Sequence, residues 1–178
     1  MLQLVLLLAC PFTPAQKDAF IVCYDTENQR PFWTAHRFTP GHPAAPRKHW
    51  RKDHELNSLP SAAFTNSGFD RGHLVAAADA PESNDTFLTS NAVAQNRQLN
   101  RGEWRQIENR IRRANQPAVI ITGAFDWSCG NEKIEAPCYL FKLARFADGA
   151  ILIAVLPNAP PQPATDKHIS EPHHSQNR

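Results

Sequence analysis

The sequence has little glycine and no long apolar segment. Glycine accounts for only 7 of the 178 residues, while proline accounts for 15. This excludes collagen-like and flexible-linker chains and favours many rigid turns. No apolar run approaches the roughly 20 residues that a membrane-spanning helix requires. A chain of this length is the size of one ordinary domain and buries about 70% of its unfolded surface, enough for a hydrophobic core.

A large excess of one charge sign is also missing, because 19 basic residues face 17 acidic ones and the formal net charge is +2. The overall balance alone therefore predicts no nucleic-acid partner. The arginines are nevertheless concentrated. Between residues 97 and 113 the chain carries six of them against two glutamates, a local net charge of +4. Such a stretch is either the solvated face of a helix or an electrostatic track for a polyanion.

Zinc-binding spacings are absent, since none of the four cysteines forms a C-x-x-C pair. Cys129 and Cys138 bracket a short polar segment that could close as a disulfide loop, worth about 2–3 kcal/mol in the chain-entropy model. Such a bridge is typical of an exported protein, whereas in a reducing compartment both residues would remain thiols. Cleavage of a leader peptide after Ala15 would leave Cys23 without a partner.

The first nine residues are apolar and lead into small and turn-forming residues, as in the core of a secretory signal, although no basic residue precedes Lys17. We predict a signal peptide over residues 1–15, a structured domain over 16–158 and a proline-rich, disordered tail over 159–178. The protein would then be secreted or periplasmic. Alternatively, the apolar start is a buried first strand, or Cys10 carries a lipid anchor.

Periodicity predicts an α+β domain with a mostly antiparallel sheet and one prominent helix. Trp104, Ile107 and Ile111 recur at three- and four-residue spacings, which indicates an amphipathic helix of about three turns that Pro117 ends. The strands that we expect lie at residues 20–24, 30–36, 86–90, 118–123, 138–143 and 150–156, with a further extended segment at 69–75.

Residue types suited to phosphate chemistry gather between residues 68 and 113. In the segment 70–73 the imidazole of His73 can exchange a proton near neutral pH, and the guanidinium of Arg71 can hold a phosphate. Asn100 either caps the following helix or offers an oxygen to a hard cation such as Mg²⁺. Glu108 would lie about 12 Å further along the helix axis, so it would act on the ion's waters rather than share direct ligation.

Taken together, residues 70–73, 90–91 and 99–104 and Glu108 closely resemble the DNA/RNA non-specific endonucleases. This is the ββα-metal nuclease family, which includes secreted bacterial nucleases and mitochondrial endonuclease G. The likeness spans roughly residues 23–158. It implies the ββα-metal nuclease fold, in which one helix carries the metal site.

The resemblance also implies a role for each matching residue. His73 would be the general base and Asn100 the direct protein ligand of Mg²⁺, with Mn²⁺ as a substitute. The supporting groups around the phosphate and the ion's waters would be Arg71, Asn91 and Glu108. The substrate contacts would include Arg71, Arg101 and either Arg47 or Lys48, since the loop spacing does not decide between the last two.

The implied activity is hydrolysis of phosphodiester bonds in DNA and RNA without sugar preference, leaving 5′-phosphate and 3′-hydroxyl ends. DNA and RNA are the expected partners, an inhibitor protein is conceivable, and the chain would act as a monomer or homodimer. Two alternatives remain open. The chain could bind nucleic acid on a nuclease scaffold without cutting it, or it could be a metal-dependent phosphodiesterase for small substrates.

Overall fold

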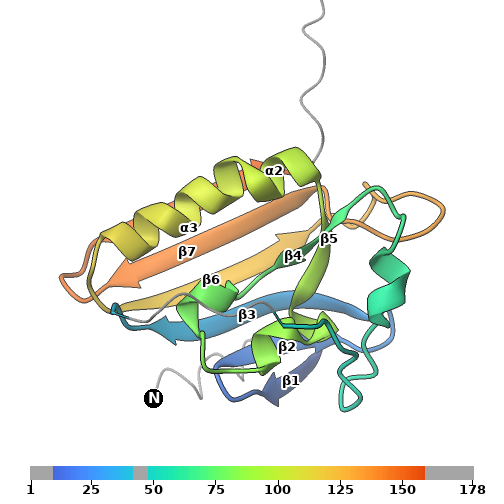
Figure 1. Cartoon of the computed structure of the whole chain (residues 1–178), viewed down its shortest axis with the longest axis horizontal. Coiled ribbons are helices and arrows are strands. Elements are labelled where there is room, and N and C mark those ends of the chain that lie inside the picture. The colour runs from blue at the N-terminus through green and yellow to red at the C-terminus, as the bar shows by residue number, and fades with distance from the viewer. Residues whose placement is uncertain (1–9, 42–47, 159–178) are drawn as a thin grey trace, which may run out of the picture.

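A computed structural model describes residues 10–41 and 48–158 of the chain (Figure 1). Its main element is a six-stranded sheet with the order β1-β2-β3-β6-β7-β8, in which every neighbouring pair is antiparallel. The strands are β1 (Thr13–Gln16), β2 (Phe20–Asp25), β3 (Arg30–Phe38), β6 (Ala118–Phe125), β7 (Tyr139–Phe146) and β8 (Ile151–Pro157). The prediction of an α+β fold with a mostly antiparallel sheet is confirmed.

A second layer lies in front of this sheet in Figure 1. It contains the two-stranded sheet of β4 (Asp70–His73) and β5 (Ala92–Gln95), and the helices α2 (Arg97–Arg101) and α3 (Glu103–Arg113). The 3₁₀ turn η1 (Ser61–Phe64) precedes β4, and the turns η2 (Ala77–Asp79), η3 (Asp85–Phe87) and η4 (Thr89–Asn91) lie between β4 and β5. The order β4, β5, helix is the ββα unit that the resemblance implies.

The two layers share a hydrophobic core between helix and sheet. One cluster joins Trp104 of α3 and Leu99 of α2 to Leu140 of β7, and a second joins Ile111 of α3 to Ile120 of β6. Trp104 and Ile111 are each only 1% exposed. The three- and four-residue spacing of apolar positions therefore marks the buried face of α3, as the sequence predicts.

The strand predicted at residues 86–90 is wrong, because this segment forms the turns η3 and η4. Backbone N–H groups bond three residues back, from Leu88 to Asp85 and from Asn91 to Leu88. The strand that pairs with β4 is the next segment, β5, with Asp70 opposite Gln95 and His73 opposite Ala92. Local β propensity is overridden here by a pairing with a distant strand.

The helical region also begins earlier than expected. Asn96 caps α2, accepting hydrogen bonds from the N–H groups of Gln98 and Leu99. Asn100 therefore lies inside α2, and its alternative role as the helix cap is wrong. Gly102, with φ −105° and ψ −108°, separates α2 from α3.

Both disulfides of the structure tie down chain ends or loops. Cys129–Cys138 closes the loop before β7, as predicted, and Cys10–Cys23 joins the segment before β1 to β2. The expected leader boundary at Ala15 lies within β1, which pairs with β2. A cut there would remove Cys10 and most of β1. The apolar start at residues 1–9 and the predicted tail at 159–178 lie outside the described residues.

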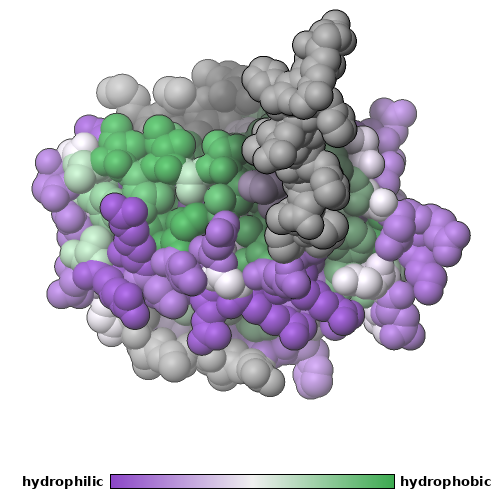
Figure 2. All heavy atoms as spheres, turned by 90° about the horizontal axis from the view of Figure 1, so that it is seen from above, coloured by the Kyte–Doolittle hydropathy of each residue, from purple (hydrophilic) through white to green (hydrophobic). Residues whose placement is uncertain are grey.

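β8 forms one edge of the large sheet and exposes apolar side chains. Ile151, Ile153 and Val155 are 60%, 68% and 54% exposed. Figure 2 shows such side chains gathered beside a band of hydrophilic ones. None of the helices within the described residues is long and apolar enough to cross a membrane.

Candidate functional site

The short antiparallel pair β4–β5 and the helices that follow it carry most of the candidate site residues. Gly72 allows β4 to approach β5 closely, since a Cβ at this position would overlap the side chain of Gln95, which is fully buried. Side chains two apart on a strand project to the same side. Arg71 and His73 therefore share one side of β4, while Asp70 projects to the other.

The imidazole of His73 is enclosed by aromatic rings. Its ring centroid lies 4.4 Å from that of Trp50 and 5.0 Å from that of Phe87. Nε2 is buried and has no hydrogen-bond partner among the described residues. Burial, and then the positive charge of Lys142, lower the pKa of His73 to about 4. The ring is therefore neutral at physiological pH, the form that can accept a proton.

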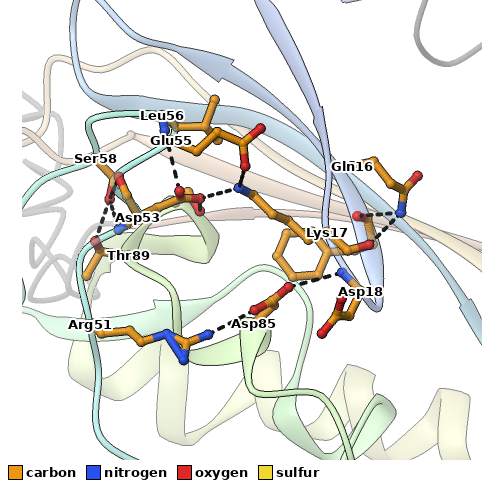
Figure 3. A network of polar contacts seen from close by, with 12 residues as sticks. Gln16, Lys17, Asp18, Arg51, Asp53, Glu55, Leu56, Ser58, Asp85 and Thr89 are labelled. Carbon is orange, nitrogen blue, oxygen red and sulfur yellow. Dashed lines mark hydrogen bonds and ion pairs between the residues drawn. The ribbon is translucent and has the colours of Figure 1, made fainter.

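The loop that carries Trp50 is held by a network of polar contacts (Figure 3). The N–H of Arg51 donates to the carbonyl of Phe87 at 3.0 Å, and its guanidinium donates to Asp85 at 2.9 Å. Two residues further, Asp53 lies 2.8 Å from Lys17 Nζ. These contacts fix Trp50 and Phe87, and with them the walls around His73. Neither aromatic residue was predicted to be part of the site, because neither belongs to the motif around His73.

Asn91, which the resemblance places among the supporting groups around the phosphate and the ion's waters, binds backbone groups in this structure. It is completely buried. Its Oδ1 accepts from the N–H of Val75 at 2.9 Å, and its Nδ2 donates to the carbonyls of Val75 and Thr86 at 3.0 and 2.9 Å. Because its amide is committed to the backbone, Asn91 cannot reach a substrate. Its contacts fix the chain just after His73.

Asn100 is held by an acidic neighbour that the sequence analysis did not assign to the site. Its Nδ2 donates to Asp70 Oδ2 at 3.0 Å. Asp70 is itself fixed by two hydrogen bonds from Arg101, both 2.8 Å long. A carboxylate only accepts, so it orients the amide of Asn100 with the NH₂ toward Asp70. The Oδ1 of Asn100 receives no hydrogen bond from the described residues and is available to a cation.

The other predicted substrate contacts have protein partners in this structure. Arg71 donates to the carbonyl and hydroxyl oxygens of Ser61. Lys48 donates to the carbonyls of Pro81 and Ser83 at 3.4 and 3.2 Å. The exposed Arg101 is paired with Asp70. Arg47 lies outside the described residues.

Glu108 lies on the partly buried side of α3 rather than on its solvated face. Its side chain is 13% exposed and is 3.7 Å from the guanidinium of Arg112. Burial raises the pKa of Glu108 despite the opposing field of Lys142. Glu108 follows Asn100 by eight residues, with the break at Gly102 between them, so the structure supports no shared direct ligation.

The structure therefore brings Asn100 to the start of β4 and His73 to its end. Three strand residues span about 10 Å, and Asn100 meets the strand through Asp70. A cavity of about 460 Å³ lies elsewhere, between β2, β3 and η2. No group of three or more His, Cys, Asp or Glu side chains within the described ranges could hold a metal ion. An ion here would depend on Asn100, substrate oxygens and water, as Mg²⁺ often does.

Two neutral histidines, the partly buried His73 and the buried His36, make acid sensitivity an expected property of the fold. Burial lowers the folded-state pKa of His73 to about 4 and also lowers that of His36, whose Nε2 is 3.4 Å from Asp79. Between pH 4 and the unfolded pKa near 6.5, the His73 ring is protonated in the unfolded chain but not in the folded one. His36 acts in the same direction. Stability contributed by the neutral rings is thus present above pH 6.5 and lost as the pH falls toward 4.

We expect His73 alone to account for about 3 kcal/mol of this loss. Glu108 acts in the opposite direction, since its raised pKa makes its contribution largest at low pH and lost as the pH rises. Urea unfolding at pH 7.5 and pH 4.5 would measure the difference, with His73→Phe as the comparison. Equal losses in the two proteins would show that His73 is not the source.

Comparison with known proteins identifies a family that matches most of the chain. The family described as DNA/RNA non-specific endonuclease matches residues 11–172. Mitochondrial endonuclease G of Homo sapiens is 28% identical over 176 residues, which cover 81% of this chain and 59% of the human protein. The mitochondrial nuclease of Saccharomyces cerevisiae is 35% identical over 106 residues, covering 52% of this chain and 32% of the yeast protein.

A crystal structure of the EndoG/EndoGI complex contains the same fold, with a TM-score of 0.70 and 20% identity over 83% of this chain and 75% of that one. The chain spans less than two thirds of the length of the endonuclease G sequences that it matches. The family match nevertheless extends over most of the chain, through β4, β5, α2 and α3. The chain belongs to the DNA/RNA non-specific endonuclease family.

Proposed function

We propose that the domain, which includes β1 and the Cys10–Cys23 disulfide and ends near residue 158, hydrolyses phosphodiester bonds in DNA and RNA as a Mg²⁺-dependent endonuclease, leaving 5′-phosphate and 3′-hydroxyl ends. One observation carries the proposal. The neutral imidazole of His73 lies at the end of β4. At the start of β4, Asp70 accepts a hydrogen bond from the amide NH₂ of Asn100, so that the amide oxygen remains available to a cation. A general base thus lies at one end of β4, and a ligand for a hard cation is held beside its other end.

His73 accepts a proton from the water that attacks phosphorus. Its Nε2 is buried without a hydrogen-bond partner among the described residues, so Nδ1 is the nitrogen that we assign to the attacking water. The low pKa keeps this acceptor unprotonated at neutral pH. A Mg²⁺ or Mn²⁺ ion held by Asn100 Oδ1 and the substrate would supply positive charge beside the phosphate oxygens.

The arginines account for binding without sequence preference. Arg71 projects to the same side of β4 as His73, where it can release Ser61 and hold a phosphate bidentately. Arg101 and the other arginines of the α2–α3 region add positive charge for a polyanion. Contacts to phosphate carry no base information, so neither DNA sequence nor the choice between DNA and RNA is read strongly.

Export fits the two disulfides of the structure. Since Cys10 is paired and β1 begins at Thr13, we place the cleavage site of a leader before Cys10 rather than after Ala15. The proposed location is extracellular or periplasmic.

Metal removal provides the direct test of the activity. In Mg²⁺ or Mn²⁺ the purified protein is expected to convert supercoiled plasmid into nicked and linear DNA and to degrade RNA. Both activities should be lost in EDTA and should return when excess Mg²⁺ is added. Cleavage that persists at full rate in EDTA would contradict the metal dependence. DNA binding without cleavage under every metal condition would instead identify a binding protein on this scaffold.

A further inference from the structure

The large sheet contains a buried lysine that the proposed mechanism does not use. Lys142 lies in β7 and is completely buried. Its Nζ donates to Thr122 Oγ1 at 2.9 Å and to the carbonyl of Leu74 at 3.2 Å, and lies 4.9 Å from the ring centroid of Trp104. Two hydrogen bonds and one aromatic face thus satisfy its three N–H groups.

Lys142 has no carboxylate within ion-pair distance among residues 10–41 and 48–158. Burial lowers the pKa of Lys142, the charges of Glu108 and Asp79 favour its protonation, and the charge of Arg112 opposes it. A cation surrounded by apolar side chains is unfavourable, and an apolar residue of similar volume often fits such a place as well or better. Packing alone therefore does not explain a lysine here.

The contact with Leu74 connects Lys142 to the site. Leu74 directly follows His73, and its N–H donates to the carbonyl of Asn91 at 3.0 Å while its own carbonyl accepts from Lys142. The peptide after His73 is therefore held from both sides. We propose that Lys142 is a positioning residue for His73, anchoring the Leu74 carbonyl and placing a fixed positive charge near the imidazole. This inference rests on the proposed function for its catalytic consequence.

The charge has a defined electrostatic effect. The rings packed against His73 belong to Trp50 and Phe87 and are uncharged, so Lys142 is the charged group that acts on the imidazole. A nearby cation disfavours the imidazolium form and adds to the effect of burial in lowering the pKa of His73. Lys142 thereby keeps the base unprotonated over a wider pH range.

Three variants separate charge, hydrogen bonding and packing. Lys142→Gln keeps a donor for Leu74 and removes the charge, and Lys142→Met removes both while retaining most of the volume. Thr122→Val is the matched control, because it removes one partner of Nζ but leaves its charge and its contact with Leu74. Circular dichroism selects the variants that retain the native fold, and Lys142→Gln keeps the test available if Lys142→Met does not fold.

NMR titration of the His73 ring is the first readout. We expect its pKa to rise by about 1 unit in either Lys142 variant, because burial persists while the cation is lost, and to stay unchanged in Thr122→Val. In cleavage assays the acidic limb of the pH–rate profile should move upward by the same amount. We expect kcat of Lys142→Met at neutral pH to fall about 10-fold, with KM changed less than twofold.

An unchanged His73 pKa in folded Lys142→Gln would overturn the proposal, as would equal effects of Lys142→Gln and Thr122→Val. The titration requires neither metal nor substrate. A wild-type protein that fails to cleave nucleic acid would therefore contradict the proposed function, while the role of Lys142 toward His73 is decided by the titration.

Discussion

Replacement of His73 by alanine is expected to lower the rate of DNA and RNA cleavage by about 10²–10⁴-fold, the usual contribution of a general base. The ring is neutral near pH 7 because desolvation and the charge of Lys142 lower its pKa, and the other proton acceptor of β4, the Asp70 carboxylate, is bound by Arg101. Nucleic-acid affinity should change little, since phosphate binding is assigned to the arginines.

The measurement is initial cleavage rate at saturating substrate, together with DNA affinity in Ca²⁺ or EDTA. His54→Ala is the matched control, because His54 is an exposed histidine in the segment between Trp50 and β4. A rate within threefold of the wild type in His73→Ala would remove His73 from the mechanism. A loss of DNA binding in parallel with rate would indicate that the ring positions substrate rather than accepts a proton.

Strong local periodicity explains which elements the sequence analysis found. The hydrophobic face of α3, the β7–β8 hairpin and the antiparallel β2–β3 pair follow from spacing and turn residues. β5 was missed because only four residues form it and its partner, β4, lies about 20 positions earlier. Nothing within so short a segment specifies that pairing, whereas the apolar and β-prone residues 86–90 imitate a strand.

The site shows the same division between local signals and tertiary contacts. A motif with matching spacing was enough to single out His73 and Asn100, and the structure connects both to β4. The burial of Asn91 could not be predicted, because an asparagine that binds backbone and one that binds substrate have the same sequence signal. Asp70 was part of the motif, but its role depends on a contact made 30 residues away.

The Cys10–Cys23 disulfide was not predicted, because it also depends on tertiary contacts. A cut after Ala15 would have removed Cys10, and this assumption left Cys23 unpaired. The antiparallel β1–β2 pair instead returns the chain alongside itself and brings the two Cα atoms to 5.5 Å, within the range that a disulfide spans. The pairing is a consequence of strand register, which the composition of either segment alone does not determine.

Replacement of Asn100 by alanine is expected to lower cleavage by more than about 10²-fold, since it removes the oxygen that we assign to the metal and with it several kcal/mol of charge stabilisation. Asp70→Ala should give a smaller loss of about 10–100-fold, because the amide remains but loses the acceptor that orients it. In Asp70→Ala the Mg²⁺ concentration for half-maximal rate should rise. Both variants should stay folded, since Asn100 and Asp70 are each only partly buried.

Asn109→Ala is the matched control for these two variants, because Asn109 lies in the next helix and its amide contacts Arg112. Its rate and its Mg²⁺ dependence should remain those of the wild type. If Asn100→Ala retained both the rate and the Mg²⁺ dependence, the ion would have to be held elsewhere. If Asp70→Ala lost more activity than Asn100→Ala, the carboxylate itself would be the group that meets the ion, and the orienting role argued from its bonds to Asn100 and Arg101 would be wrong.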